Sequence, residues 1–493
     1  MFVSVETSIG VQEPPPGEAV HSTARLWASA AAVAALGAWV LFDAHPGLNW
    51  PLWTGAAAAG LIALHRHKRA DSSANPVLLL GIAATTIAGA AAVTASNRLH
   101  AVIFASVLVL LAMQMLLSVD PSWSRITARF AVTAPPVALF HAVLCALRRA
   151  VEATEHIRST RARAWIRGLA LTIPVSIVFA LLLAEADPTL ARWRDVIDAI
   201  VSHWAFLPRV VFFTALLGLV LGAYGYALTA PTTASSSVTR EPARWLGATE
   251  RVMLLAAVTA LLWLFLALQV GYLFGSLPRM AATDMTFAEY ARRGFGELTI
   301  VASASAVLIL LSERYGQRDR HAPMARVLAL ALVVADLLVL SSAFHRVMLY
   351  EAAYGFTTAR LYAQAYMLIV AAALALLALE VARGLDTGRL FRRTATVAVV
   401  LFVGLLYWNH ESWIAHRNIE RFASTGQLDV AYLTGELSAD AVSAIVNALT
   451  LLPEPRRTEL RTAVQRRYAT HPLPARERWF EWNRSRVRAK ASF

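Results

Sequence analysis

The sequence predicts an all-α, polytopic membrane protein, in which a bundle of about 11 transmembrane helices precedes a small C-terminal helical domain. Two observations predict the bundle. The chain is 57% hydrophobic and only 16% charged, against roughly 25% charged residues in soluble domains, and its apolar residues gather in runs long enough to cross a bilayer. A third observation predicts the domain, because an amphipathic pattern typical of soluble helices replaces these runs beyond residue 409.

The first 24 residues contain three glutamates and the run Pro14–Pro16 but no lysine or arginine. A secretory signal peptide begins with a basic region. We therefore expect residues 1–24 to be a disordered cytoplasmic tail and the first apolar run to be a retained helix.

Eleven apolar runs of roughly spanning length follow, each bounded by charged residues, proline or glycine. They lie near residues 25–43, 50–64, 76–95, 99–117, 167–185, 206–228, 251–275, 296–312, 324–347, 359–382 and 394–408. These runs predict a transmembrane bundle over residues 25–408, with 10–12 spans. A further run, Ala131–Leu147, contains Pro135-Pro136 and is too short to span, so we expect it to lie in the membrane interface.

Basic residues are distributed unequally between alternate loops. With a cytoplasmic N-terminus, the inner loops hold roughly twenty lysines and arginines and the outer loops roughly seven. This ratio predicts a cytoplasmic N-terminus, and an odd number of spans then places the C-terminus on the extracytoplasmic side. The same clusters account for the formal charge of +13 without a nucleic-acid partner, because they lie between apolar runs rather than along one polar domain.

Residues 409–493 are expected to form the extracytoplasmic helical domain. Ser438 is a candidate N-cap for a helix that Pro453 and Pro455 end, and a second helix is expected over Arg456–Tyr468. The first helix has one apolar stripe, made of Val442, Ile445, Val446 and Leu449. The chain closes with Trp479, Phe480 and Trp482 in a basic tail that we expect to rest on the membrane surface.

Three polar segments are predicted to form loops on the outer face, at Phe287–Glu297, Phe344–Tyr366 and Asn409–Arg421. If they converge, they form one outward-facing pocket. The candidate binding residues of the second segment are His345, Arg346, Tyr350, Glu351, Tyr354 and Arg360.

In the first segment, Glu289, Arg293 and Glu297 are spaced four residues apart, so a helix would place them on one face. This charge ladder could bind a charged headgroup, an ion or a substrate. It could equally neutralise itself while fixing the entry of the next helix.

Asp336 lies about twelve residues into a predicted span, near the bilayer midplane. A carboxylate at that depth must be protonated, paired or hydrated. A proton- or ion-linked role and a buried interhelical hydrogen bond both stay open, with Gln269 as a candidate partner.

No cofactor or metal site is predicted. His345, His410 and His416 with Glu411 lack the spacing of a known metal motif. Walker, nucleophile-elbow and kinase signatures are also missing from the sequence. The single cysteine, Cys145, excludes an internal disulfide and is expected to be a packing residue.

Three segments resemble a known family of bacterial membrane proteins. They are TFAEYARRGFGEL (Thr286–Leu298), SAFHRVMLYEAAYGFTTARLYA (Ser342–Ala363) and HRNIERFASTGQLDVAYLTGELSADAV (His416–Val442). Together they resemble the uncharacterised family of domain of unknown function 4173, from about Arg251 to the C-terminus. The resemblance implies a bacterial plasma-membrane location and an all-helical fold, and it implies no activity.

Three functions are compatible with these patterns. The leading hypothesis is a non-enzymatic protein that senses or binds an extracytoplasmic ligand or partner protein through its outer-face loops. A transporter or channel that uses Asp336 as a coupling group is the second. The third is an intramembrane lipid- or glycan-modifying enzyme with Glu289, Glu297 or Glu411 as acid or base.

Overall fold

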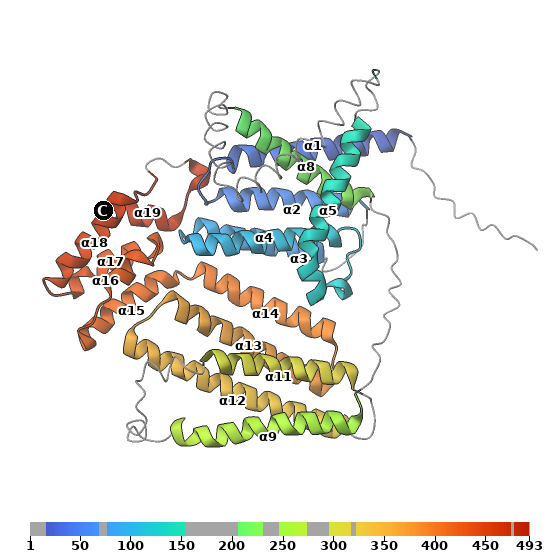
Figure 1. The fold of residues 1–493 in the computed structure, drawn as a ribbon. Helices are drawn as coiled ribbons and strands as arrows, with labels where there is room; N and C mark the ends of the chain where they lie inside the picture. Colours follow the sequence, from blue (N-terminus) through green and yellow to red (C-terminus); the bar gives the residue numbers. More distant parts are fainter. Residues whose placement is uncertain are drawn as a thin grey trace, which may run out of the picture.

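The computed structural model describes residues 16–68, 76–153, 159, 206–229, 246–273, 295–316, 322–474 and 478–492. Within these ranges every regular element is a helix, and long helices lie side by side through most of the molecule (Figure 1). The predicted all-α bundle is therefore confirmed.

The N-terminal helices form what we call the first helix group. It consists of α1 (Pro16–Val40), α2 (Asn49–Lys68), α3 (Pro76–Gly89), α4 (Asn97–Leu117), α5 (Ala128–Ala153) and α8 (Leu207–Thr229). Leu26, Leu117 and Tyr224 are buried in its core. The Tyr224 hydroxyl donates to the carbonyl of Ala57 at 3.0 Å, so this buried polar group is satisfied by a neighbouring helix.

The second helix group has its own apolar core. It consists of α9 (Ala248–Leu273), α11 (Phe295–Tyr315), α12 (Ala322–Tyr354) and α13 (Thr358–Arg383), around buried Leu255, Ile309, Leu332 and Leu374. Helix α14 (Thr387–Tyr407) lies between the two groups (Figure 1). Its Leu406 packs with Ile87 and Ile103 of the first group, so α14 joins the two halves of the bundle.

Nine helices in the described part of the chain are long and apolar enough to cross a membrane, namely α1, α4, α5, α8, α9, α11, α12, α13 and α14. All of them except α5 coincide with predicted spans. The runs at 50–64 and 76–95 form α2 and α3, which pack within the first helix group but do not reach that length and hydropathy. The run at 167–185 lies outside the described residues.

Helix α5 corrects one prediction. The sequence predicts that the apolar run around Pro135 and Pro136 is too short to span, but this run belongs to a helix of 26 residues with both prolines inside. The helix continues beyond the apolar run at both ends, through residues 128–130 and 148–153. Its small residues Ala134, Ala138 and Ala142, four apart on one face, are buried against other helices of the first group.

The contacts of α5 nevertheless stay at one end of its neighbours. The His141 and Tyr226 rings are stacked with centroids 4.9 Å apart, and Ala142 lies directly against Gly222 of α8. Figure 1 shows α5 inclined across α2 and α4 rather than parallel to them. An interfacial helix would adopt this placement, so its position in the interface stays a prediction.

The polar segment Phe344–Tyr366, predicted to be a loop, is almost entirely helical. Helix α12 continues for 33 residues to Tyr354, and only Gly355–Thr357 separate it from α13. At 1.5 Å per residue α12 is about 50 Å long, which exceeds the roughly 30 Å hydrocarbon core of a bilayer. The polar last turns of α12 therefore extend the helix beyond the length that a membrane requires, and this explains why hydropathy alone suggested a loop.

The C-terminal domain follows α14 directly. Its helices are α15 (His410–Thr425), α16 (Val430–Gly435), α17 (Val442–Ala448), α18 (Arg456–Thr470) and α19 (Arg484–Lys490). Ile414, Ile445 and Leu460 are buried together in its core. The predicted apolar stripe and the second predicted helix are confirmed, and Ser438 caps the short turn that leads into α17.

Candidate functional site

The C-terminal domain covers one end of the helix bundle, which we call the domain end (Figure 1). Three turns between helices meet the domain there: residues 41–48 between α1 and α2, residues 93–96 before α4, and Gly355–Thr357 between α12 and α13. Each turn is held by side chains of the domain through its backbone groups. The three attachments explain why this end of the bundle can act as one surface.

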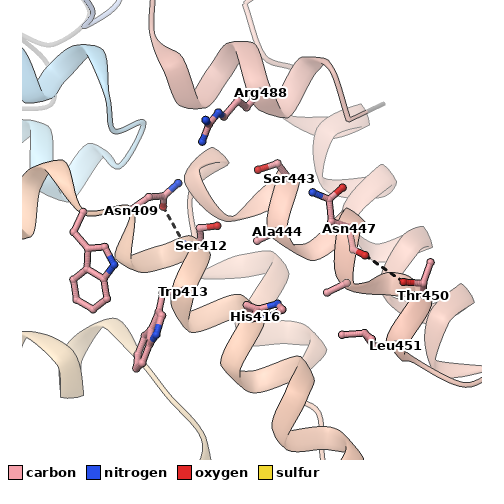
Figure 2. A pocket seen from close by; sticks show the side chains of 12 residues that line it. Asn409, Ser412, Trp413, His416, Ser443, Ala444, Asn447, Thr450, Leu451 and Arg488 are labelled. Atoms are coloured by element: carbon pink, nitrogen blue, oxygen red, sulfur yellow. Dashed lines mark hydrogen bonds between the residues drawn. The ribbon is translucent and has the colours of Figure 1, made fainter.

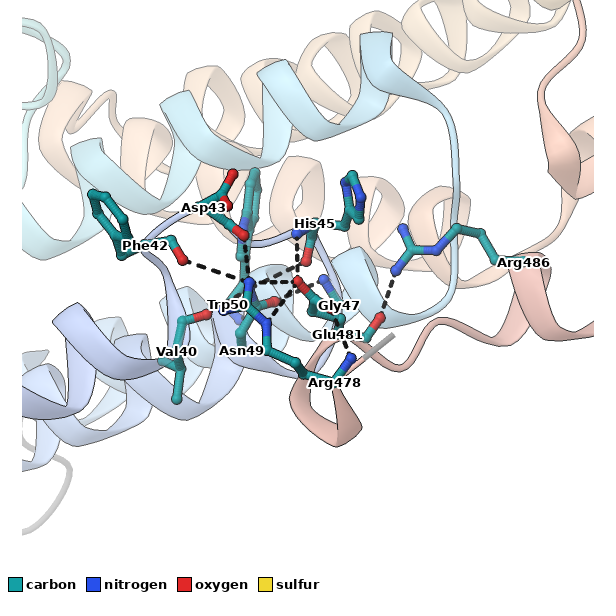
Figure 3. Close-up of polar contacts among 10 residues, drawn as sticks. All are labelled: Val40, Phe42, Asp43, His45, Gly47, Asn49, Trp50, Arg478, Glu481 and Arg486. Carbon is teal, nitrogen blue, oxygen red and sulfur yellow. Dashed lines mark hydrogen bonds and ion pairs between the residues drawn. The ribbon is translucent and has the colours of Figure 1, made fainter. Parts of the chain in front are cut away.

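The first turn is held by the C-terminal tail (Figure 3). The Glu481 carboxylate accepts from the backbone N–H of His45 at 3.1 Å and pairs with Arg478 at 2.7 Å. Arg478 also donates to the carbonyl of Asp43. Phe480 is 2% exposed and packs its ring on Trp39 of α1, with centroids 5.6 Å apart. The tail therefore folds against the bundle at this point.

The second turn is held by two buried side chains. Asp440 accepts from the Thr94 hydroxyl at 2.5 Å and from the backbone N–H of Ala95 at 2.7 Å. The Asn483 amide donates to the carbonyls of Ala91 and Thr94 at 2.8 and 2.7 Å. Because polar groups buried at this contact would otherwise lack partners, both side chains fix how the domain sits on the bundle.

The third turn is held by a reciprocal pair of bonds. The Asn418 side chain accepts from the N–H of Phe356 and donates to its carbonyl, each at 2.8 Å. The Tyr432 hydroxyl accepts from the N–H of Thr358 at 2.8 Å. Gly355 has a φ of +85°, and a Cβ there would lie 2.5 Å from the Asn418 side-chain oxygen. A glycine is therefore required on both conformational and steric grounds.

A cavity of about 440 Å³ lies between these turns and the domain. We call it the interface cavity. Its ionisable lining includes Arg98 and His100 of α4, Glu411 of α15, Glu436, Arg467 of α18 and Arg486 of α19. Both the bundle and the domain thus contribute to one polar space.

The charges around the interface cavity are unevenly paired. Arg98 pairs with Glu436 at 2.6 Å, and both side chains are exposed. Arg467 donates to the carbonyl of Leu437 at 2.5 Å, and Arg486 donates to the carbonyl of Glu481. Because a carbonyl carries no net charge, the bond to Leu437 does not neutralise the guanidinium group of Arg467.

Glu411 and His410 are buried where α15 begins. The Glu411 carboxylate accepts from the N–H of Ser438 at 2.5 Å. Burial, and then the nearby Asp440 carboxylate, raise the pKa of Glu411 above its ordinary value. Burial lowers the pKa of His410. Its Nδ1 lies 3.2 Å from the Trp408 carbonyl, so Nδ1 carries the proton, and Nε2 accepts from the Tyr362 hydroxyl at 3.0 Å.

Four of the predicted binding residues come together at the third turn. The Arg360 guanidinium lies 4.1 Å from the centroid of the Tyr350 ring and donates to the carbonyl of Gly355. The Tyr354 ring lies 5.0 Å from Tyr350. Glu351 accepts from Gln364 of α13 at 2.7 Å. These contacts join α12 to α13 and support the turn on which the domain rests.

Other predicted residues lie apart from this cluster. His345 is exposed on α12, whereas Arg346 is buried. Asp336 is 0% exposed, and within the described ranges neither carboxylate oxygen has a hydrogen bond of good geometry, although the Ser305 hydroxyl lies close. It is fifteen residues from Glu351, or about 22 Å along the helix. Asp336 therefore belongs to the bundle interior and not to the domain end.

The charge ladder cannot be placed in the same way. Glu289 and Arg293 lie outside the described residues. Glu297 is in the first turn of α11, but its side chain, like that of Gln269, also lies outside them. The second and third polar segments meet, through the bonds between Asn418 and Phe356. That the first segment joins them stays a prediction.

The histidines of the possible metal site do not converge. His410 is buried beside Tyr362, and His416 pairs with Glu420 at 3.0 Å on the exposed face of α15. Across the described ranges, no group of three histidine, cysteine, aspartate or glutamate side chains could hold a metal ion.

A profile described as domain of unknown function (DUF4153) matches residues 71–448 of the chain. The chain belongs to this family. Membership of an uncharacterised family is thereby confirmed, but the match is to DUF4153 and does not confirm the resemblance to family 4173. No curated protein and no solved structure matches the chain.

The part matched to DUF4153 includes Glu411 and Asp440 and ends with α17. Sequence reasoning missed Asp440, although its place two residues after the Ser438 cap is a signal for a polar helix start. It also missed Glu481, Asn483 and Arg486, which lie beyond the matched range. Glu481 and Asn483 bond to turns about 390 to 440 residues away, and no local pattern carries that information.

A second hollow lies on the outside of the domain of this DUF4153 protein (Figure 2). We call it the surface groove. It has a volume of about 580 Å³ between α15, α17 and α19, with Trp413, Asn447 and Arg488 in its lining. Only Trp408 and Asn409, where α14 passes into α15, connect the surface groove to the bundle. It is therefore less suited than the interface cavity to link the domain with the helices.

Proposed function

We propose that this protein binds a small anionic ligand in the interface cavity and transmits binding from the C-terminal domain to the helix bundle. The observation that carries the proposal is the shared lining, in which α4 contributes Arg98 and the domain contributes Arg467 and Arg486. A ligand that touches both sides must change the free energy of their association. Such a coupling is what a membrane sensor requires.

The charge of the interface cavity favours an anion. Three arginines line it against two carboxylates, Glu411 and Glu436. Burial raises the pKa of Glu411, so this carboxyl group is more readily protonated than an exposed glutamate, and its protonation would leave the cavity more positive. A ligand with carboxylate or phosphate oxygens would accept from the guanidinium groups.

Small anions test this proposal directly. The probes are succinate and inorganic phosphate, and the readout is the thermal unfolding midpoint of the detergent-solubilised full chain. Asn97 lines the interface cavity and is exposed, so Asn97→Trp should fill the space. Asn447→Trp, at an exposed position in the surface groove, is the matched control. We expect a ligand-dependent rise in the wild type and the control and none in Asn97→Trp. Equal rises in both variants, or none in the wild type, would reject the site.

We further propose that the domain end faces outward from a bacterial plasma membrane, with a cytoplasmic N-terminus. The distribution of lysine and arginine supports this orientation. In a Cys145→Ser background, Tyr354→Cys should react with an impermeant maleimide on intact cells, whereas Ser124→Cys at the other end of the helices should not. The reverse labelling pattern would place the interface cavity in the cytoplasm.

A coupling role of Asp336 is the second candidate, since a fully buried carboxylate without a well-formed hydrogen bond is costly unless it is protonated or hydrated. Proton or ion flux into vesicles containing the purified protein should then fall in Asp336→Asn. Absence of flux in the wild type, or flux unchanged by the substitution, would exclude this candidate.

An enzymatic role rests on Glu411, which is buried at the interface cavity and bonds to the backbone of Ser438 rather than to an arginine side chain. A carboxyl group with a raised pKa suits a general acid. Glu411→Gln should then abolish turnover of a lipid or glycan substrate while anion binding persists. Equal turnover in wild type and variant would remove Glu411 as the general acid.

A further inference from the structure

The end of the bundle opposite the domain, which we call the far end, contains a cavity of about 720 Å³, larger than the interface cavity and the surface groove. It lies where α9 and α12 begin and where α11 and α13 end. We call it the far-end cavity. Its basic lining residues are Arg251, Arg314 and Arg326, one from each of three helices. Helix termini at the end of membrane spans lie at the depth of lipid headgroups.

The far-end cavity is lined by three arginines and by two carboxylates, Glu313 and Asp386, each of which already has a partner. Arg251 is 4% exposed and pairs with Glu313, yet its Nε has no partner among the residues described. Asp386 is engaged as the N-cap of α14, where it accepts from the N–H of Arg389. Arg314 and Arg326 are exposed, and neither forms an ion pair within the described ranges.

Exposed apolar side chains lie close in sequence to these arginines. Met253 is two residues after Arg251 on α9 and is 67% exposed, while Met324 is two residues before Arg326 on α12 and Val327 directly follows it, at 55% and 65% exposed. Such surfaces on membrane-spanning helices contact acyl chains. A ligand with an anionic head and apolar chains would satisfy both features, whereas free phosphate would use only the first.

We propose that the far-end cavity binds the phosphate headgroup of an anionic phospholipid. Arginine suits this role because its planar guanidinium group binds phosphate oxygens in pairs. Basic pockets between the cytoplasmic ends of transmembrane helices are a general means of recognising such lipids. The inference is independent of the interface cavity, which lies at the other end of the helices.

The test uses the full chain in vesicles of phosphatidylcholine with or without phosphatidylglycerol. We expect phosphatidylglycerol to raise the thermal unfolding midpoint of the wild type and to be retained preferentially when bound lipid is measured by native mass spectrometry. Arg314→Gln with Arg326→Gln should weaken retention by about 5-fold for each arginine. The charge-matched control, Arg129→Gln with Arg148→Gln, changes two exposed arginines of α5 and should leave retention unchanged.

Two further arms identify the source of the phosphate group and separate charge from folding. Inorganic phosphate should not reproduce the midpoint rise, because it lacks acyl chains. The double replacement by lysine should restore part of the retention, since it keeps charge and loses the paired geometry. A rise with inorganic phosphate but not with phosphatidylglycerol would overturn the proposal. Equal retention by the double glutamine variant and its control would also overturn it.

Discussion

The two ends of the helix bundle use polar side chains differently. At the domain end, Asp440, Asn483 and Asn418 bond to backbone groups of the turns between helices. At the far end, the buried carboxylate of Glu380 bonds instead to the side chains of Arg389 and Arg393. Backbone groups are fixed in position by the helices that they join, so the first arrangement sets the geometry of a contact. Side-chain pairs set mainly the balance of charge.

This difference suggests different tasks for the two ends. A contact of fixed geometry can transmit a change from a ligand to the helices, which suits the interface cavity. The far end, where Arg314 and Arg326 are exposed and form no ion pair within the described ranges, is suited to hold an anion from the membrane surface. Substitutions matched between the two ends can test the contrast.

Loss of Asp440 should have the largest effect. Asp440→Ala removes a buried carboxylate and leaves the donors of Thr94 and Ala95 without their partner, at a cost of about 3 kcal/mol in the free energy of unfolding. Chemical unfolding of the purified protein, with hydrogen exchange at residues 93–96, would measure it. Glu436→Gln is the control, because its pair with Arg98 is exposed and should contribute little. Equal effects would show that the domain is not held by buried bonds.

A pair of glycines sharpens the contrast. Gly355 at the domain end and Gly384 at the far end both have positive φ, at +85° and +95°. A Cβ at Gly355 would meet Asn418, whereas one at Gly384 would meet open space. We expect Gly384→Ala to destabilise the fold by about 1 kcal/mol through backbone strain alone and Gly355→Ala by about 2 kcal/mol or more. Similar unfolding free energies for the two variants would contradict a tightly fitted domain contact.

The bundle could be predicted from the sequence because a membrane span is a continuous apolar run, which neighbouring residues alone identify. Runs of apolar residues identify α4, α9 or α13 without knowledge of their neighbours, and the stripe from Val442 to Leu449 identifies a helix with one buried face. The C-terminal turns of α12 were predicted to be a loop because that prediction also relied on local composition. Polar residues such as Arg346 and Glu351 lower the hydropathy, but the backbone stays helical.

The sites were less predictable, because they depend on contacts between distant segments. Glu351 and Arg360 were recognised as unusual residues, yet they support a turn and do not line the interface cavity. That cavity is formed instead where the C-terminal tail returns to the first helix group, bringing Glu481 to His45 across 436 residues of sequence. Among the ionisable residues of that cavity, only Glu411 was singled out in advance as a candidate site residue, through its place in the polar segment that follows the last span.

At the far end, Glu380→Gln should have a moderate effect. Glu380 is 0% exposed, but both of its arginine partners are about two-fifths exposed, so solvent screens much of their attraction. We expect a loss of about 1–2 kcal/mol in unfolding free energy, smaller than for Asp440→Ala. Glu420→Gln, in an exposed pair with His416, should change little. A loss larger than that of Asp440→Ala would mean that the far end is the more tightly fixed of the two.

The smallest effect concerns pH at the domain end. Burial raises the folded-state pKa of Glu411 above its ordinary value of 4.5. Its protonated form is therefore favoured in the folded protein, and the associated stability is full below pH 4.5 and is lost as pH rises through the raised value. Each unit by which the pKa is raised corresponds to about 1.4 kcal/mol. Burial lowers the pKa of His410 from 6.5, so its contribution has the opposite sign and is lost as pH falls through the lowered value.

Unfolding midpoints measured across pH 4 to 8 should thus fall less steeply toward high pH in Glu411→Gln than in wild type, with Glu420→Gln as the exposed control. Parallel profiles for all three proteins would show that the pKa of Glu411 is the same in the folded and unfolded states, and would remove its raised pKa as a reason for the interface cavity to be more positive.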